Sequence, residues 1–285
     1  MIDYLLIGHV TQDRVDENRV VLGGTATYAA ITARNLGRRT AVLTSAAFEP
    51  GLVDVLERIL VARVPAAETT RFVNRYENGR RFQTVEAIAE PLASEQLLPE
   101  WRHPQIVHLA PLVREIKPEA VSAFPRSFVG VTPQGWMRSW DDGGNVRSTE
   151  WASARIVLGR ADATVLSEQD LSDPTELDPL VVLAKLLVLT RGQRGASVYS
   201  PGSSVQHVPA FVAAREADPT GAGDVFAAAF FIHFQSGRDP LESAEFANCV
   251  ASFAVEKRGW SGIPTLEQVQ DRLRRGNRHG YAGPA

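Results

Sequence analysis

The sequence predicts an α/β protein with a mostly parallel central sheet that is covered by helices on both faces. Short apolar runs that stop at turn residues recur along the 285 residues, a pattern typical of strands buried on both faces. A helical segment rich in alanine lies between the first two runs, and the order strand, helix, strand implies parallel pairing. At 285 residues, of which 44% are hydrophobic, the chain is long enough and apolar enough to form one sizeable domain with a core, or at most two small domains.

The first strand is expected at Tyr4–Ile7, before Gly8, and the second at residues 40–45. The helix between them covers residues 26–36 and ends at Gly37, the residue type expected for a left-handed C-terminal cap. The same pattern predicts four more buried strands, at residues 106–109, 128–132, 164–166 and 187–190.

One segment departs from this pattern. Residues 69–76 and 80–87 alternate polar and apolar side chains on either side of Glu77-Asn78-Gly79, which indicates a β-hairpin. Such alternation suits strands with one solvated face. The hairpin is either a flap over a site or an ordinary edge hairpin, and the alternation alone leaves both interpretations open.

Composition disfavours several classes of function. A formal net charge of -3 gives no electrostatic reason to expect nucleic acid or an anionic membrane as the main partner. Cys249 is the single cysteine, so a reducing, cytoplasmic setting fits best, and the six histidines show no metal-ligand spacing. No basic leader and no membrane-spanning stretch is expected. Residues 276–285 lack apolar periodicity and are expected to form a flexible tail.

The segment from Asp218 to Asp224, Asp-Pro-Thr-Gly-Ala-Gly-Asp, leads into residues 225–232, which are apolar on every face and predict a buried helix. A glycine-rich turn at the start of such a helix favours anion binding, because unpaired N–H groups and the helix dipole point at the ligand. A carboxylate beside a phosphate makes sense if it faces an attacking hydroxyl while the N–H groups stabilise the transferring phosphoryl group. The competing interpretation, a tight helix start with Asp224 favourably placed against the dipole, leaves the run of small residues unexplained.

Two common nucleotide-binding motifs do not fit. Gly221 and Gly223 are followed by Phe226 where the dinucleotide fingerprint requires its third glycine, and no clear strand precedes them. The sequence also contains no Gly-Lys-Ser/Thr phosphate loop.

These residues resemble the C-terminal signature of the ribokinase-like carbohydrate kinases, also called the PfkB family, in which an Asp-Thr-x-Gly-Ala-Gly-Asp turn precedes a helix. Pro219 varies the second position. Further matches follow the family's order over about residues 1–270: Gly23-Gly24, the Thr-x-Gly-x-x-Gly loop at residues 190–195, and Ala247-Asn248. The resemblance implies a three-layer ribokinase-like sandwich over residues 1–275, with a small β lid contributed by about residues 11–22 and 66–90.

The resemblance implies a kinase that transfers the γ-phosphoryl group of ATP to a hydroxyl of a sugar or cyclic polyol, with Asp224 as general base. Gly221, Ala222 and Gly223 would form the anion hole for the γ-phosphate. Asp13, Gly23 and Gly24 would bind the acceptor, for which a carboxylate suits because it accepts two hydroxyl hydrogen bonds. The residues implied for the nucleotide are Ser167, Thr190, Gly192, Gly195 and Asn248.

Two positions depart from the family pattern. The Asn-x-x-Glu motif appears as Ser167-Glu168-Gln169-Asp170; Asp170 keeps a charged oxygen ligand, so Mg²⁺ is still expected, held through water, and Glu168 is an alternative ligand. Tyr28 stands where many members have asparagine, so specificity for ribose-like sugars is not carried over. Tyr28 either packs in the core or stacks on a ring of the acceptor.

Other polar residues are candidates for ligand contact. Gln83 lies on the hairpin, and Gln134 and Arg138 follow a predicted strand, where ligands of parallel sheets bind. Arg138 suits an anionic acceptor or a phosphate, or is a surface residue beside two tryptophans. Asp218 and Thr220 resemble a loop that binds a monovalent cation in some members, which gives K⁺ as a possible cofactor.

The acceptor is not identified by the sequence. A hexose or inositol is preferred because Tyr28 replaces the family's asparagine. The alternatives are a nucleoside kinase of the same fold, or a catalytically weak regulatory protein that binds a sugar or nucleotide. The altered motif at residues 167–170 supports a regulatory protein, and the intact Gly-Ala-Gly-Asp turn argues against it. The expected assembly is a monomer, or a homodimer formed through the lid.

Overall fold

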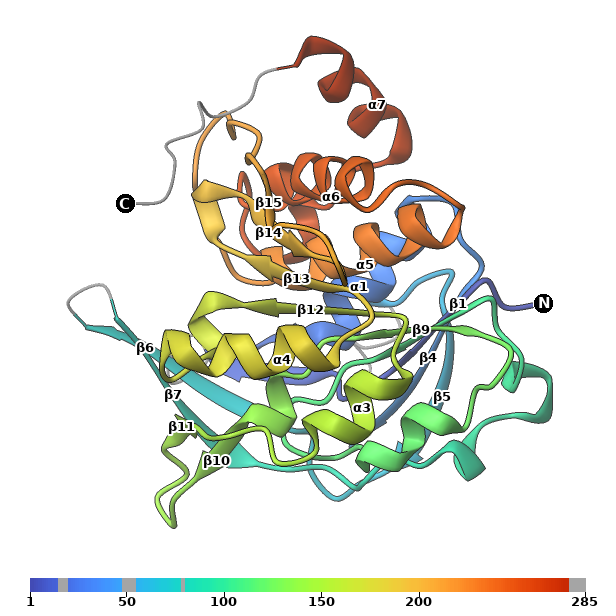
Figure 1. The fold of residues 1–285 in the computed structure, drawn as a ribbon. Helices are drawn as coiled ribbons and strands as arrows, with labels where there is room; N and C mark the ends of the chain where they lie inside the picture. The colour runs from blue at the N-terminus through green and yellow to red at the C-terminus, as the bar shows by residue number, and fades with distance from the viewer. Residues whose placement is uncertain (15–19, 48–54, 78–79, 277–285) are drawn as a thin grey trace.

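The computed structural model describes residues 1–14, 20–47, 55–77 and 80–276 (Figure 1). Its centre is a nine-stranded sheet with the strand order β15-β14-β13-β12-β9-β8-β1-β4-β5. Neighbouring strands are parallel from β5 to β13, and only the pairs β13–β14 and β14–β15 within this sheet are antiparallel. The strands are β1 (Tyr4–Ile7), β4 (Thr40–Ala46), β5 (Leu60–Pro65), β8 (Ile106–Leu109), β9 (Phe128–Val131), β12 (Ala163–Ser167), β13 (Leu187–Thr190), β14 (Ala196–Tyr199) and β15 (Gln206–Val208).

The continuous apolar runs of the sequence are explained by cores on both faces of this sheet. In β1, Tyr4 and Leu6 belong to one cluster of buried side chains, and Leu5 and Ile7 belong to another. Successive side chains of a strand point to opposite faces, so a strand with a core on each side has no solvent-facing position, and its few polar side chains, such as His108 of β8, are buried. The predicted α/β architecture with a mostly parallel sheet is confirmed.

The helices form a layer on each face of the sheet (Figure 1). One face packs against α1 (Gly24–Asn35), α5 (Ala222–Gln235) and α6 (Pro240–Ala254), with α7 (Leu266–Arg275) on α6. The other face packs against α3 (Ala154–Arg160) and α4 (Leu177–Leu183). Short 3-10 helices fill the connections: η1 (Ser94–Gln96), η2 (Pro99–Trp101), η3 (Pro118–Ser122), η4 (Gln134–Met137), η5 (Glu168–Asp170), η6 (Pro174–Glu176), η7 (Gly192–Arg194) and η8 (Gly259–Gly262).

Helix α5 lies between α1 and α6 in its layer. It contacts α1, α6 and strands of the sheet, and residues 225–232 are all buried. A helix with neighbours on every side has no solvent face, which explains why its sequence is apolar without a helical period. The first turn of α5 is thereby held rigidly against the sheet.

A second, four-stranded sheet has the order β3-β2-β6-β7. Strands β6 (Arg71–Glu77) and β7 (Arg80–Ala87) pair antiparallel as the alternation predicted; Asn78 and Gly79 of the predicted turn lie outside the described residues. Strands β2 (Thr11–Arg14) and β3 (Val20–Gly23) complete the sheet. Phe72 and Val85 of this second sheet pack against Leu112 and Val113 in a small buried cluster.

Several elements were not predicted from the sequence. A small antiparallel hairpin of β10 (Arg138–Trp140) and β11 (Val146–Ser148) joins the second sheet, where the Val85 N–H donates to the Gly144 carbonyl at 2.9 Å. Strands β5 and β15 lie at the two edges of the main sheet, where one side of the strand is solvated and the apolar signal is weak. Strand β14 pairs on both sides but is only four residues long and contains Ser197. Of the predicted tail, residues 277–285 lie outside the described part of the chain. In that described part, no helix has both the length and the apolar character required to cross a membrane.

Candidate active site

A cavity of about 1120 Å³ lies between the second sheet, the ends of β12 and β13, and the start of α5. A space of this size exceeds that of an ordinary small-ligand pocket and can hold two reactants together. Most of the residues predicted for the site line it: Asp13, Gly24, Tyr28, Gln83, Gln134, Arg138, Ser167, Asp170, Thr190, Gly192, Gly195, Thr220, Gly221, Ala222, Gly223, Asp224 and Asn248.

Gly221 shapes the start of α5. It is the residue before the helix and has a φ of 78°, in the left-handed region that favours glycine. A side chain here would also collide with the Tyr28 ring, which packs against it. The turn is closed by the Ala222 N–H, which donates to the Pro219 carbonyl at 3.2 Å. The predicted anion hole is therefore a tight turn at a helix start, supported from below by an aromatic ring.

Asp224 lies in the first turn of α5, on the wall of the cavity. The Thr25 hydroxyl donates a hydrogen bond to Asp224 Oδ1 at 2.8 Å. Thr25 is buried at the start of α1 and was not among the residues predicted for the site. Its place directly after Gly23-Gly24 was the one sequence signal that could have found it.

The end of the cavity where the acceptor-binding residues were expected is built from the second sheet and the start of α1. A side chain at Gly23 would overlap the Asp13 carboxylate, so that carboxylate lies directly on the Gly23 backbone. Gly24 has a φ of 81° and begins α1. Gln83 Nε2 donates to Asn74 Oδ1 at 2.9 Å across the β6–β7 pair, which fixes the orientation of the Gln83 amide.

Other acceptor-end residues were missed by sequence reasoning. The cavity is also lined by apolar and aromatic side chains of the second sheet and the β10–β11 hairpin. The turn Asp141-Asp142-Gly143-Gly144 was a hairpin signal between two short extended segments, and it was not used. The additional residues are Thr11, Phe72, Phe82, Leu112, Val146, Arg147 and Ser148.

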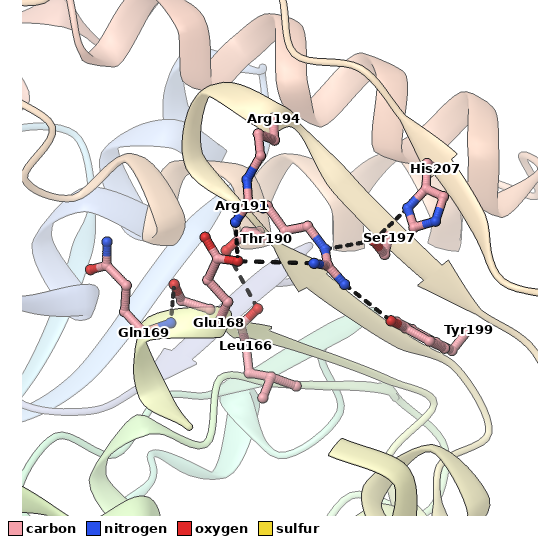
Figure 2. Close-up of polar contacts among 10 residues, drawn as sticks. Leu166, Glu168, Gln169, Thr190, Arg191, Arg194, Ser197, Tyr199 and His207 are labelled. Atoms are coloured by element: carbon pink, nitrogen blue, oxygen red, sulfur yellow. Dashed lines mark hydrogen bonds and ion pairs between the residues drawn. The ribbon is translucent and has the colours of Figure 1, made fainter. Parts of the chain in front are cut away.

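The altered motif at residues 167–170 follows β12. Asp170 Oδ1 accepts a hydrogen bond from Gln134 Nε2 at 2.9 Å, and Asp170 Oδ2 accepts one from the Ser167 N–H at 2.9 Å. These contacts hold the Asp170 carboxylate at the cavity wall. Glu168 is not one of the residues that line the cavity; its carboxylate pairs with Arg194 and lies 4.0 Å from Arg191 (Figure 2).

Figure 2 shows how the loop after β13 is held in place. Arg191 reaches under the loop, where its Nε donates to Ser197 Oγ at 2.8 Å and its NH2 group donates to the Tyr199 hydroxyl at 3.4 Å. Ser197 in turn contacts His207 Nδ1 at 2.8 Å. The loop that carries Thr190, Gly192 and Gly195 is thereby tied to β14 and β15.

The end of the cavity where the nucleotide-binding residues were expected lies beyond this loop. Asn248 on α6 donates from Nδ2 to the carbonyls of Val208 and Pro209, both at 3.1 Å, which fixes the segment that follows β15. Small and apolar residues of that segment and of α5 and α6 form the remaining wall, together with the Gln193–Glu216 side-chain pair. The members of this wall are Ala210, Phe211, Val212, Ala213, Phe226, Ala251, Ser252 and Val255.

Asp218 braces the turn before α5. Its Oδ1 accepts a hydrogen bond from the Thr220 N–H at 3.0 Å, and its Oδ2 accepts one from the Gly259 N–H at 3.2 Å. Asp218 is not among the cavity-lining residues, whereas Thr220 is. Both carboxylate oxygens of Asp218 therefore accept hydrogen bonds from backbone amides, and the carboxylate joins the loops that carry these amides.

A buried polar chain crosses the sheet near the start of α5. The Tyr4 hydroxyl lies 2.6 Å from His108 Nδ1, and His108 Nε2 lies 2.9 Å from Thr132 Oγ1. Burial lowers the pKa of His108 to about 3, and burial followed by the negative charge of Asp224 raises the pKa of Tyr4 well above its usual value. Both groups are therefore uncharged at neutral pH.

Comparison with curated proteins finds carbohydrate and nucleoside kinases. Residues 155–266 match the family model of the pfkB family carbohydrate kinases. The chain is 26% identical over 271 residues to a cytidine kinase of Thermococcus kodakarensis, covering 85% of this chain and 91% of that protein. It is 32% identical over 136 residues to a ribokinase of Bacillus subtilis, covering 41% and 46%. It is 31% identical over 99 residues to a nucleoside kinase of Methanocaldococcus jannaschii, covering 34% and 32%. These last two matches span less than half of each relative.

Solved structures of the ribokinase family share the fold. A pyrophosphate-dependent kinase in the ribokinase family, complexed with a pyrophosphate analog and myo-inositol, superimposes with a TM-score of 0.77 at 21% identity. That match covers 94% of this chain and 99% of the other. Arabidopsis thaliana ribokinase complexed with ribose and ATP superimposes with a TM-score of 0.72 at 18% identity, covering 96% and 99%. The expected ribokinase-like fold is confirmed.

Proposed function

We propose that this chain, which belongs to the ribokinase-like (PfkB) family of carbohydrate kinases, transfers the γ-phosphoryl group of ATP to a hydroxyl of a sugar or cyclic polyol. One observation carries the proposal: a left-handed glycine turn and a carboxylate lie together at the start of a buried helix, on the wall of one large cavity. The turn offers backbone N–H groups to a phosphate, and Asp224 offers an oxygen to an alcohol.

The chemical step uses these two groups in different ways. Asp224 accepts the proton of the attacking hydroxyl while the oxygen of that hydroxyl forms a bond to the γ-phosphorus. The bond between the γ-phosphorus and the bridging oxygen breaks, and ADP leaves. The N–H groups of Gly221 and Gly223 stabilise charge on the transferring group, together with the N–H group of Ala222, which is shared with the Pro219 carbonyl that closes the turn. Because this transition state is loose, a carboxylate of ordinary basicity is sufficient for the proton transfer.

The donor end of the cavity supports ATP. A pyrophosphate donor requires only polar contacts for its phosphates, whereas this cavity continues into a wall of small and apolar residues beyond the Thr190–Gly195 loop. Such a wall suits a planar base, which binds through apolar contact and a few placed polar groups. ATP is therefore expected to support turnover, and pyrophosphate is expected to fail as a donor.

Mg²⁺ fits the residues at the end of β12. Among the described residues there is no group of three or more histidine, cysteine, aspartate or glutamate side chains able to hold a metal ion. This agrees with Mg²⁺ chemistry, because Mg²⁺ is usually held by one or two carboxylates, waters and the phosphates of the substrate. Asp170 is the carboxylate that would hold it, with Gln134 fixing its orientation. When bound, Mg²⁺ would neutralise phosphate charge.

A monovalent cation such as K⁺ would bind the turn before α5. Because the Asp218 carboxylate already accepts two backbone hydrogen bonds, it braces this turn, and carbonyl groups near Thr220 are the ligands we propose for K⁺. Cys249 is buried, and as the single cysteine of the sequence it has no second cysteine with which to form a disulfide within the chain. We therefore propose a reducing, cytoplasmic setting for the enzyme.

The acceptor end supports a polyhydroxylated ring. Asp13 and Gln83 provide hydrogen-bonding groups for hydroxyls, and Phe72 and Phe82 provide apolar surface for a ring face. A hexose or inositol is the acceptor we favour, because Tyr28 packs under Gly221 and provides no asparagine amide for a ribose hydroxyl.

A nucleoside is the second candidate acceptor. The aromatic side chains at this end of the cavity suit a base, and the relative with the widest coverage among those compared above is a cytidine kinase. In that case the phosphorylated hydroxyl belongs to the ribose. The two candidates are separated by the same assay panel.

The test couples ADP release to a panel of D-fructose, myo-inositol, D-ribose and cytidine, with ATP or pyrophosphate as donor. Asp224→Asn should lower kcat on the best acceptor by at least about a hundredfold. Asp178→Asn, at an exposed position on α4, is the control and should keep wild-type kcat. If Asp224→Asn keeps most of its activity, the assigned base is wrong. Tight binding of ATP and an acceptor by calorimetry without turnover would instead favour a regulatory binding protein.

A further inference from the structure

The hydrogen bond between Thr25 and Asp224 joins two elements far apart in the sequence. Thr25 lies in the first turn of α1 and is 3% exposed, and Asp224 lies in the first turn of α5. The Thr25 hydroxyl donates to Asp224 Oδ1 at 2.8 Å, and both residues line the cavity. The Thr25 hydroxyl therefore bonds directly to the carboxylate that is proposed as the base.

The other threonine hydroxyls of α1 are directed differently from that of Thr25. Thr27 donates to the Gly23 carbonyl at 2.6 Å, and Thr32 donates to the Tyr28 carbonyl at 2.8 Å. Both bonds run back to the residue four positions earlier, the usual outlet for a threonine hydroxyl inside a helix. Thr25 stands at the second position of the helix and crosses to α5 instead.

We propose that Thr25 is a positioning residue for the base: its hydroxyl anchors Oδ1 and so directs Oδ2 of Asp224 to the proton of the acceptor hydroxyl. The inference rests on the proposed kinase function. The terminal torsion of an aspartate side chain is soft and broadly populated, so a carboxylate without an anchor samples many orientations. Holding the base in the reactive orientation removes that freedom before the chemical step.

The same arrangement connects the base to the acceptor end of the cavity. Gly23 ends strand β3 of the second sheet and lies against the Asp13 carboxylate, and Gly24, with a φ of 81°, begins α1. Thr25 is the next residue. A displacement of β3 when the acceptor engages Asp13 is therefore transmitted to Asp224 over only two residues and one hydrogen bond.

The test compares variants that separate the hydroxyl from the methyl group. With ATP and the panel member of highest kcat/KM, Thr25→Val should lower kcat by about tenfold to a hundredfold while the acceptor KM stays within about threefold. Thr25→Ser keeps the hydroxyl and should remain within about threefold of wild-type kcat. Thr32→Val removes a hydroxyl that bonds to the Tyr28 carbonyl within its own helix and should keep wild-type kcat.

The inference is overturned if Thr25→Val keeps kcat within twofold, or if Thr25→Ser falls as far as Thr25→Val, the result expected of a packing role. If Thr25→Val does not melt cooperatively, Thr25→Ser and Thr25→Ala replace it, because these two differ only in the hydroxyl. Asp224→Asn separates the two levels of the proposal. An active Asp224→Asn enzyme refutes the assigned base, whereas an inactive one beside a fully active Thr25→Val enzyme refutes the role of Thr25 alone.

Discussion

Gly221 and Gly223 lie two residues apart at the start of α5, yet their backbones impose different demands. Gly221 has a φ of 78° and the Tyr28 ring against its Cα. Gly223 lies inside the helix, and a methyl group added there would meet no atom within 4 Å. The first glycine is required by the fold of the turn, and the second is not required by packing.

Gly221→Ala should therefore lower the free energy of unfolding by more than about 2 kcal/mol, since it adds both backbone strain and a clash with an aromatic ring. Gly223→Ala should raise it by up to about 1 kcal/mol, because alanine is the better helix former. Urea denaturation followed by circular dichroism measures both variants. Equal effects of the two substitutions would contradict this description of the turn.

His108 makes the stability of the fold depend on pH. Its pKa of about 3 in the folded protein is below the usual 6.5, because the ring is fully buried. Above pH 6.5 the ring is neutral in both states and its contribution to stability is complete. Below pH 6.5 the unfolded chain binds a proton that the folded protein does not bind, so stability is lost as the pH falls toward 3.

The expected loss attributable to His108 is about 1 kcal/mol between pH 7.5 and 5.5, since the limiting slope is about 1.4 kcal/mol per pH unit. His108→Gln should be less stable at neutral pH and should show a flatter dependence over this interval. His103→Gln, at an exposed position, should keep the wild-type dependence. Urea midpoints at the two pH values provide the measurement, and an unchanged slope in His108→Gln would refute the assignment.

At the scale of elements, the loop after β13 depends on Arg191 more than on Arg194. Arg191 is held by Ser197 and Tyr199 of the neighbouring strand, whereas the Arg194 side chain is 64% exposed (Figure 2). An exposed ion pair such as that of Arg194 with Glu168 contributes less than about 1 kcal/mol to stability. The half-buried contacts of Arg191 fix the loop that lines the donor end.

Arg191→Ala should raise the KM for ATP by roughly tenfold and leave the acceptor KM within about twofold, because it loosens only the donor end of the cavity. Arg194→Ala is the matched control and should change either KM by less than about threefold. Steady-state kinetics with each substrate varied in turn test the difference. A larger effect of Arg194→Ala on the ATP KM would mean that Arg194, not Arg191, acts at the donor end.

At the scale of the whole molecule, the second sheet lines the end of the cavity that we propose for the acceptor, and the main sheet and its helices line the end that we propose for the donor. The four strands are joined by backbone pairing and by side-chain contacts such as Arg14 with Glu86 at 2.9 Å. Val20, Val21 and Phe82 remain 44%, 44% and 52% exposed. A sheet with this much exposed apolar surface is suited to close on a bound acceptor.

Adding the acceptor should therefore slow amide hydrogen exchange in β2, β3, β6 and β7 by about tenfold, because closure reduces local opening. A nonhydrolysable ATP analogue alone should slow exchange in the loop at residues 190–195 and leave the second sheet nearly unchanged. Peptides from β14 provide the internal control for the acceptor. Protection of the second sheet by the ATP analogue alone would contradict the division of the cavity.

The sequence by itself determined the α/β architecture, because a strand with a core on each face must be apolar throughout. This signal was strong in Tyr4–Ile7 and in the buried residues 225–232 of α5. It also determined the segments expected to bind phosphate, since left-handed glycines and a carboxylate at a helix start are local features. The predicted hairpin at residues 69–87 was recovered for the same reason, because alternation is a local pattern.

Only the tertiary structure decided which side chains meet. Edge strands β5 and β15 and the β10–β11 hairpin have weak apolar patterns, because one side of each is solvated. The contact between Thr25 and Asp224 spans 199 positions, and nothing in either local segment announces it. Likewise, Glu168 pairs with arginines while Asp170 faces the cavity, although both are acidic residues of one short motif. Local pattern fixes the elements, whereas the orientation of a polar side chain depends on partners that folding brings from elsewhere in the chain.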